Sequence, residues 1–237
     1  MPASFGTLYG IGVGPGDPDL LTIKATKVLA DVDIVLAASS TKNDYSTALS
    51  IAQPHMQNDV EVVHLGFPMT RDEKVLLKAW EHNAKVVADL LKQGKNCAFL
   101  TLGDPLIYST FGYLKRTLEA IDTSFEISVI PGITSYQASA ARTGTILCES
   151  GENLLLASGV RATEDTKELL RHVDNAVILK TYKNFAELKS LLQETNRKDA
   201  AIFISRLGMD GEIIARNIDD APEKPHYFSH MLIPVEK

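Results

Sequence analysis

The 237-residue chain contains little cysteine, a single tryptophan and no long apolar run. Its two cysteines, Cys97 and Cys148, lie far apart in the sequence and make no pair with metal-ligand spacing, which fits a reducing compartment. No apolar run approaches membrane-spanning length, and residues 1–6 lack the basic and apolar regions of a signal peptide. The sequence therefore predicts a cytoplasmic protein without a membrane partner.

Basic runs and metal-ligand clusters are missing as well. The chain has 24 lysines and arginines against 30 aspartates and glutamates, and no basic run is long enough to bind nucleic acid. His226 and His230 are four residues apart, but Pro225 and the neighbouring aromatic residues favour a strand, and a third zinc ligand is lacking. We therefore expect neither a nucleic-acid partner nor a metal site.

The chain does contain 45% hydrophobic residues, enough to bury the core of one large domain or two small ones. Helical patterns separate most of the segments that are expected to be strands, which predicts an α/β fold with a parallel, helix-flanked sheet. The expected strands are residues 7–13, 34–37, 60–64, 96–101, 126–130, 153–157, 176–180 and 201–205.

The last third of the chain has a different pattern. A hairpin around residues 206–212 and a terminal strand at 227–235 predict a mixed second sheet. The clearest helix is residues 72–92, with one apolar stripe and Gly94 as its C-terminal stop. The domains are predicted to be residues 1–122 and 123–237.

Residues 97–112 combine a strand, a glycine turn and the expected start of a helix. Residues 97–101 are uncharged, as in a strand that is buried on both faces. Gly103 allows a tight turn, Asp104 can cap a helix, and Pro105 suits a first helical position. Such a turn lies at the carboxyl end of a strand, where open α/β sheets bind ligands. Taken alone, the Gly-Asp-Pro triplet predicts only a strand-to-helix connection.

Residues 9–25 repeat this arrangement with a glycine-rich loop. Its spacing does not fit a dinucleotide fingerprint, because Pro15 or Asp17 stands where the third glycine is needed, and serines at 39–40 replace the ribose-binding acid. No Gly-Lys-Ser/Thr follows the glycines, and Asp17 and Asp19 would repel a phosphate. The loop is therefore predicted to pack closely or to face a ligand with little negative charge.

Residues 129–138 form a third strand-turn-helix segment. Gly132 turns the chain, and Thr134 or Ser135 can cap the helix that follows. Their hydroxyl groups are expected at another strand end. Taken alone, this segment predicts an ordinary helix cap.

Together the three segments resemble the tetrapyrrole methyltransferases, the S-adenosylmethionine-dependent enzymes of corrin and sirohaem biosynthesis. The matching runs are Gly-Val-Gly-Pro-Gly-Asp-Pro-Asp-Leu-Leu-Thr at 12–22, Gly-Asp-Pro-Leu-Ile-Tyr-Ser at 103–109 and Pro-Gly-Ile-Thr-Ser at 131–135. Their order and spacing are specific and span most of the chain. Residues 99–111, together with Leu-Gly-Phe-Pro-Met at 65–69, resemble the branch that methylates C20 of precorrin-2. Other branches usually have a glycine where Ser109 stands.

The resemblance implies two α/β/α domains, a mostly parallel N-terminal sheet, a mixed C-terminal sheet and a cleft for S-adenosylmethionine. Pro15 is expected to border this cleft from the first loop. Gly103, Asp104 and Ile107 match positions that hold the methionine and sugar portions of the cofactor.

Further cofactor positions are implied in the second half of the chain. Thr134 and Ser135 match a pair that hydrogen-bonds the cofactor. Leu179 stands where relatives often have a methionine, and Leu207 matches a backbone contact to the adenine. Family members also resemble homodimers, which is the assembly expected here by analogy.

The tetrapyrrole substrate would be a polycarboxylate, whereas the chain has a net charge of −6, so local positive charge must attract it. We expect Arg71 and Lys180 to bind its carboxylates, out of a wider set of candidates: Lys42, Arg71, Arg142, Lys180 and Lys183. Methyl transfer from a sulfonium is a direct displacement, and holding the two reactants in line can contribute ~7–11 kcal/mol. The group that removes the proton afterwards is not identified by the sequence; Tyr108 and Asp104 are candidates, with a structural role favoured for each.

Three alternatives stay open at this point. A nicotinamide oxidoreductase would use the same strand ends, but the glycine spacing speaks against it. A non-catalytic tetrapyrrole carrier would bind the substrate and not the cofactor. A sister methyltransferase would act at C11, C17, or C2 and C7 of uroporphyrinogen.

Overall fold

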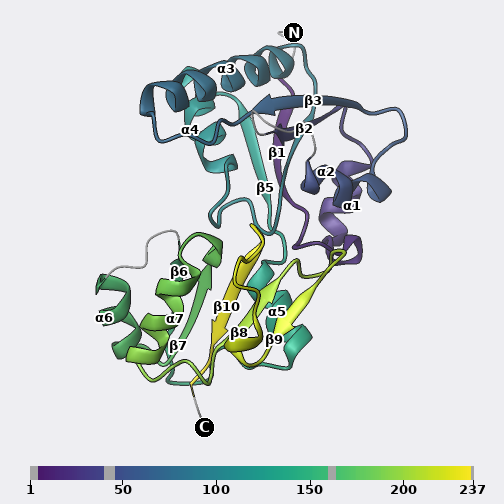
Figure 1. Cartoon of the computed structure of the whole chain (residues 1–237). Helices are drawn as coiled ribbons and strands as arrows, with labels where there is room; N and C mark the ends of the chain where they lie inside the picture. The colour runs from purple at the N-terminus through teal and green to yellow at the C-terminus, as the bar shows by residue number, and fades with distance from the viewer. Residues whose placement is uncertain (1–4, 40–45, 160–163, 236–237) are drawn as a thin grey trace. The chain divides into compact units, whose positions relative to one another are not determined.

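The computed structural model describes residues 5–39, 46–159 and 164–235. The chain divides into two compact units, the first ending at Thr134 and the second beginning at Ser135 (Figure 1). Lys42, one of the basic candidates, lies outside the described residues. None of the helices within the described ranges is long and apolar enough to cross a membrane.

The first unit contains a five-stranded, fully parallel sheet with the order β3-β2-β4-β1-β5. The expected strands are confirmed, with ends that differ by a residue or two. Their bounds are β1 Thr7–Gly12, β2 Ile34–Ser39, β3 Glu61–Gly66, β4 Cys97–Thr101 and β5 Glu126–Ile130. Every residue of β4 is buried because this strand is central and covered on both faces.

Helices cover both faces of this sheet, as Figure 1 shows. Helices α3 and α4 pack on one face, where Val87 and Leu114 join Leu36 and Phe99 in a buried cluster. Helices α1 and α2 lie on the other face. The helices and short 3-10 segments are η1 Pro18–Leu20, α1 Ile23–Leu29, α2 Thr47–Ala52, η2 Gln53–His55, α3 Glu73–Lys92 and α4 Phe111–Ile121.

Local signals in the sequence fix both ends of α3. The Asp72 carboxylate accepts hydrogen bonds from the backbone N–H groups of Lys74 and Val75, at 2.9 and 3.4 Å. At the other end, Gly94 has φ +80° and its N–H donates to the Leu91 carbonyl oxygen at 2.9 Å. The predicted helix and its glycine stop are therefore confirmed.

Replacing Asp72 by alanine is expected to lower the free energy of unfolding of the first unit by about 1 kcal/mol, because two N–H groups lose their cap. Urea unfolding followed by the fluorescence of Trp80, the single tryptophan, measures this change. Asp89→Ala is the matched control, since Asp89 is an exposed aspartate within the same helix. Equal stability of the two variants would contradict the capping role.

The second unit contains a five-stranded mixed sheet with the order β6-β7-β10-β8-β9. Strands β6 and β7 are parallel, and the other neighbours are antiparallel. This confirms the predicted hairpin, which β8 and β9 form, and the predicted terminal strand. The bounds are β6 Leu154–Ser158, β7 Asn175–Leu179, β8 Ile202–Ser205, β9 Ile213–Ala215 and β10 Ser229–Ile233.

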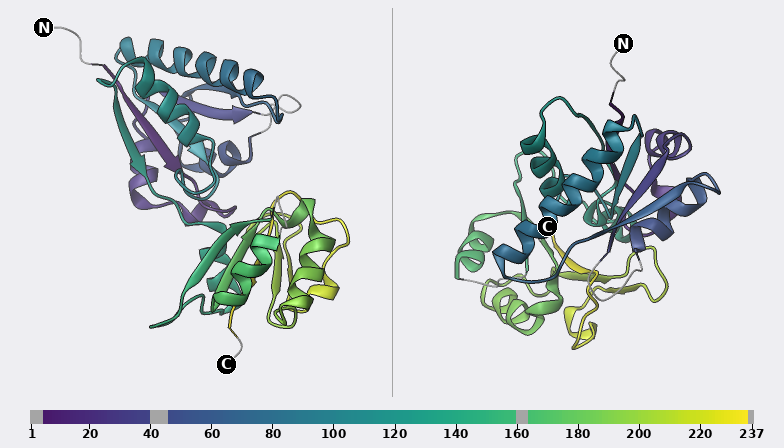
Figure 2. Two further views of the ribbon diagram at one scale, coloured as in Figure 1. Left: turned by 90° about the vertical axis from the view of Figure 1, so that its left-hand side faces the viewer. Right: turned by 90° about the horizontal axis from the view of Figure 1, so that it is seen from above.

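The helices of the second unit also lie on two faces of their sheet (Figures 1 and 2). Helices α6 and α7 cover a cluster that contains Leu188, Phe203 and Met231, whereas α5 packs with Val177 and Leu207 on the opposite face. The bounds are α5 Ser135–Thr143, α6 Glu164–His172, η3 Thr181–Lys183, α7 Phe185–Glu194 and η4 Ile218–Asp220.

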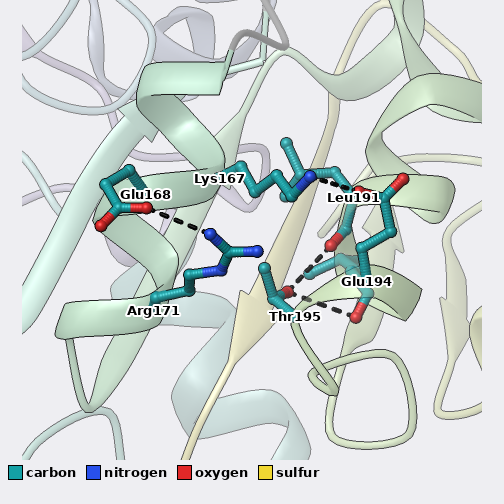
Figure 3. A network of polar contacts seen from close by, with 7 residues as sticks. Lys167, Glu168, Arg171, Leu191, Glu194 and Thr195 are labelled. Carbon is teal, nitrogen blue, oxygen red and sulfur yellow. Dashed lines mark hydrogen bonds and ion pairs between the residues drawn. The ribbon is translucent and has the colours of Figure 1, made fainter.

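Polar contacts connect α6 and α7 at their surface, as Figure 3 shows. Lys167 of α6 pairs with Glu194 of α7, and Arg171 pairs with Glu168 along α6. The Thr195 hydroxyl donates to the Leu191 carbonyl oxygen at 2.9 Å and closes the end of α7. Because at least one partner of each pair is solvent-exposed, the buried cluster beneath the helices contributes more to stability than these pairs do.

The division between the units differs from the predicted boundary at 122/123. Strand β5 begins after that point and pairs with β1, so it belongs to the first sheet. The chain leaves the first unit only after Thr134. The sequence could not place this division, because the pairing of β5 with the distant strand β1 is not visible in the local sequence.

Candidate functional site

Three glycines, one from each motif, meet at the carboxyl ends of β1, β4 and β5. A Cβ atom added to Gly132 would lie 2.1 Å from the carbonyl oxygen of Gly103 and 2.7 Å from the Cα atom of Gly12. The Gly103 N–H donates to the Gly14 carbonyl oxygen at 2.8 Å, so the first two loops are also hydrogen-bonded. The loops thus pack backbone to backbone, and this arrangement, here named the glycine junction, requires residues without a side chain.

Asp104 connects the second motif to the third. Its Oδ1 accepts from the Leu106 N–H at 2.8 Å, and its Oδ2 accepts from the Gly132 N–H at 3.2 Å. The prediction that Asp104 and Pro105 begin a helix is wrong, because α4 begins only at Phe111. Asp104 caps a turn instead, and its carboxylate holds the glycine junction together.

The residues between Asp104 and α4 form an exposed apolar turn. Leu106, Ile107 and Tyr108 are 61%, 37% and 50% exposed. Tyr108 has φ +49°, a left-handed conformation that is unfavourable for a residue with a side chain. Strained backbone of this kind is often found at ligand-binding sites, so the turn is a candidate contact surface.

Other predicted residues lie close to the glycine junction along the chain. Pro15 follows Gly14 in the first loop and is buried. Thr134 is 7% exposed, and Ser135 is the first residue of α5. The Cα atom of Thr134 lies 3.8 Å from the Cβ position of Gly103, which brings the second and third motifs into contact.

The hydroxyl group of Thr101, at the end of β4, was not singled out from the sequence. It is buried and has no hydrogen-bond partner among the described residues. A buried polar atom without a partner costs about 1–3 kcal/mol, so it is expected to meet a ligand or a water molecule. Its position directly before the Gly103 loop is the only signal in the sequence that could have indicated it.

Leu179 and Leu207 come together in the second unit. Leu179 ends β7 and Leu207 follows β8, the two strands that flank β10, and both contribute to one apolar cluster, which also includes Tyr136 of α5. Their implied roles toward the cofactor stay predictions. No group of side chains that could hold a metal ion occurs in the described part of the chain.

The two basic residues proposed for the substrate lie in different surroundings. Arg71 is exposed, in the loop between the edge strand β3 and α3. Lys180 follows β7 with φ +58° and is half-buried. Burial, with a smaller effect from the charge of Lys183, lowers the pKa of the Lys180 ammonium. The two are not brought together within either unit, because Arg71 belongs to the first and Lys180 to the second.

A pocket at the end of β8 was also missed. Its volume is about 460 Å³, and Ser205, Arg206 and His226 are among its lining residues. His226 is distant in sequence from the other two, and only the pairing of β8 with β10 brings it near them. The single signal in the sequence was a basic residue directly after an uncharged buried strand.

Curated relatives match over nearly the whole chain. The cobalt-precorrin-2 C(20)-methyltransferase of Salmonella typhimurium is 32% identical over 232 residues, which are 96% of each chain. A probable cobalt-precorrin-2 C(20)-methyltransferase of Methanocaldococcus jannaschii is 34% identical over 216 residues, 90% of this chain and 88% of the relative. A precorrin-2 C(20)-methyltransferase of a Sinorhizobium species is 29% identical over 97% of this chain and 95% of its own.

Solved structures share the fold. The cobalt precorrin-4 methyltransferase CbiF superposes with a TM-score of 0.74 at 20% identity, covering 96% of this chain and 94% of that one. A uroporphyrin-III C-methyltransferase from Thermus thermophilus in complex with S-adenosylhomocysteine has a TM-score of 0.69 at 20% identity. The match covers 97% of this chain and 92% of that one. The sequence model of the tetrapyrrole (corrin/porphyrin) methylase family matches residues 7–221. This match confirms the resemblance that was inferred from the three motifs. The chain therefore belongs to the tetrapyrrole methylases.

Proposed function

We propose that this protein transfers a methyl group from S-adenosylmethionine to C20 of precorrin-2, or of its cobalt form, in cobalamin biosynthesis. The full-length similarity to relatives that carry this name supports the reaction. Membership of the tetrapyrrole methylases supports the class of substrate. The enzyme is predicted to be a cytoplasmic homodimer.

The observation that carries the cofactor proposal is the glycine junction with the unpartnered Thr101 hydroxyl beside it. At Gly103 an added Cβ atom would meet nothing closer than 3.8 Å, so a ligand can approach the backbone there, and the Thr101 hydroxyl offers a hydrogen bond that the described residues do not use. The chemistry fits a cationic sulfonium compound, because carboxylates lie in the first two loops. We propose that the following residues hold S-adenosylmethionine: Pro15, Thr101, Gly103, Asp104, Ile107, Thr134, Ser135, Leu179 and Leu207.

S-adenosylmethionine, when bound, supplies an electrophilic methyl group on sulfur. The chain's own residues then have to position the reactants and exclude water, which needs no covalent catalyst. The rigid backbone contacts of the glycine junction suit this task, because Gly12, Gly103 and Gly132 fix the loops without flexible side chains.

The proton that leaves C20 after methylation requires an acceptor. Both oxygens of Asp104 already accept backbone N–H groups, which favours a positioning role for this carboxylate. Tyr108 is half-exposed on the apolar turn and stays a candidate beside the reacting carbon. Arg71 and Lys180 are the candidates for binding the substrate's carboxylates, and burial of Lys180 would strengthen such an ion pair.

Calorimetric titration with S-adenosylhomocysteine tests the cofactor site. We expect one site per subunit with a micromolar Kd, and about threefold to tenfold weaker binding by Thr101→Val, the loss that corresponds to one hydrogen bond. The stability of this variant is expected not to fall, because the removed hydroxyl has no partner among the described residues.

Thr7→Val is the matched control, since Thr7 is a buried threonine at the opposite end of the neighbouring strand β1. Equal affinities of the two variants would exclude Thr101 from the site. Turnover of precorrin-2 with and without cobalt then identifies the substrate, and methylation at another ring position would identify a sister methyltransferase. Tetrapyrrole binding without any cofactor binding would instead identify a carrier.

A further inference from the structure

The pocket at the end of β8 is lined by groups that favour an anion. It has a volume of about 460 Å³, and its polar lining comes from β8, the loop after it and the segment before β10. Arg206, Lys224 and His226 line it, and none of the lining residues carries a carboxylate. The pocket therefore carries local positive charge, although the chain as a whole has a net charge of −6.

The backbone around Arg206 is arranged to present its guanidinium group. Arg206 has φ +53°, and its N–H donates to the Phe228 carbonyl oxygen at 2.9 Å. Gly211 has φ +78°, which favours glycine, and the Arg206 side chain lies over it, with Nη1 2.7 Å from the position of an added Cβ atom. Within the described ranges the Arg206 guanidinium forms no ion pair, and its one hydrogen bond, to the Asp210 carbonyl oxygen, is long at 3.4 Å.

The remaining polar groups add donors to the same pocket. The Phe228 N–H donates to Nδ1 of His226 at 3.2 Å, so Nδ1 is an acceptor and the proton of the neutral ring resides on Nε2. Burial and the nearby Arg206 charge lower the pKa of His226, which keeps the ring neutral. Three carboxylates are adjacent in sequence to lining residues, those of Asp210, Glu212 and Glu223. Glu212 is paired with Arg142 and with the Gly208 N–H.

Ser205 supplies a second, independent indication of a ligand. It is 1% exposed, lines the pocket, and its hydroxyl oxygen has no hydrogen-bond partner in the part of the chain that the structure describes. The opposite residue Ser229 is satisfied by the Thr181 hydroxyl, so the strand pairing itself does not leave hydroxyls unpaired here. A ligand oxygen in the pocket would supply the missing partner.

We propose that this pocket binds a carboxylate, held by the Arg206 guanidinium and the Ser205 hydroxyl. Arginine recognises a planar carboxylate through two parallel hydrogen bonds. Ile213, Pro222 and Tyr227 provide apolar walls beside the charged group. One source is a carboxylate arm of the tetrapyrrole substrate, which rests on the proposed function, and the other is a free small carboxylate.

Binding of two probes to wild type and Arg206→Gln tests the proposal. Uroporphyrin III, a porphyrin with eight carboxylates, is titrated by its fluorescence, and succinate is titrated by calorimetry. We expect the Kd of one probe to rise about 10-fold to 100-fold, the loss that corresponds to a hydrogen-bonded charge. Arg171→Gln is the matched control, because it removes the same charge from an exposed site on α6.

Weaker uroporphyrin binding identifies the substrate arm, and KM for precorrin-2 then rises while kcat changes by less than about twofold. Loss of succinate binding alone identifies a free carboxylate. Unchanged binding of both probes overturns the proposal. If Arg206→Gln does not fold, Ser205→Ala repeats the test. The Ser205 hydroxyl forms no hydrogen bond within the described residues, so its removal is not expected to unfold the protein. Binding of S-adenosylhomocysteine, measured in parallel, reports separately on the proposed function.

Discussion

Gly132→Ala is expected to destabilise the first unit by about 3 kcal/mol and to abolish binding of S-adenosylhomocysteine. The new methyl group would lie 2.1 Å from the Gly103 carbonyl oxygen and 2.7 Å from backbone atoms of Gly12. Neither backbone can retreat easily, because Gly103 is hydrogen-bonded to Gly14 and the Asp104 carboxylate accepts the Gly132 N–H. The variant would therefore force the three loops apart.

Urea unfolding followed by Trp80 fluorescence reports the stability of this unit, and calorimetry reports ligand binding. Gly66→Ala is the matched control, because Gly66 ends β3 of the same sheet and a Cβ atom there meets nothing within 4 Å. Both glycines have ordinary backbone angles for a residue with a side chain, so the contrast isolates the effect of space. If both variants unfold at the same urea concentration, the glycine junction does not exist as described.

Acidification from pH 6.5 to about 4 is expected to destabilise the second unit by about 3 kcal/mol through His230 alone. Full burial lowers the pKa of this side chain from 6.5 to about 4. Between these two values the unfolded chain binds a proton that the folded chain does not. Stability is therefore complete above pH 6.5 and is lost as the pH falls through this window.

Hydrogen exchange of the β10 amides at pH 7, 5.5 and 4.5 measures this loss, after correction for the intrinsic exchange rates. His230→Gln is the informative variant, because an amide can still bond the Ser139 hydroxyl, which now lies 2.7 Å from Nε2, but does not titrate. Its protection should not depend on pH in this window. Lysines donate hydrogen bonds to the carboxylates of Asp219 and Glu194 and lower their pKa values. The stability that these two pairs contribute is therefore lost at a lower pH than the stability that depends on His230. If the protection of the β10 amides in the wild-type protein does not change with pH, the assignment to His230 is contradicted.

The sequence predicted the strands and the longest helix well, because the signals for these elements are local. Uncharged segments such as residues 97–101 became buried strands, and Asp72 and Gly94 marked the ends of α3. The hairpin before Ile213 indicated the mixed character of the second sheet. Neither the order of the strands nor the assignment of β5 to the first sheet could be read from such signals, because both depend on pairing between distant segments.

The candidate site was predicted at the level of its loops and not of its contacts. The first glycine-rich loop was predicted to pack closely or to face a ligand, and the structure shows that its Gly12 packs closely against the glycines of the other two motifs. Asp104 was expected to cap a helix, yet its carboxylate reaches Gly132, which no local rule could indicate. Thr101 and Ser205 were overlooked, because an unsatisfied hydroxyl is recognised only after every neighbouring donor and acceptor is known.

Strand β10 follows the other four strands of the second sheet along the chain and lies at the centre of that sheet. Until it leaves the ribosome, β6 and β7 form one two-stranded ribbon and β8 and β9 another, each with an open edge. Two-stranded ribbons are marginal in water, and unpaired edges invite aggregation. The second unit therefore has to wait for Ser229–Ile233 before it can fold, whereas the first unit has every strand of its sheet well before synthesis ends.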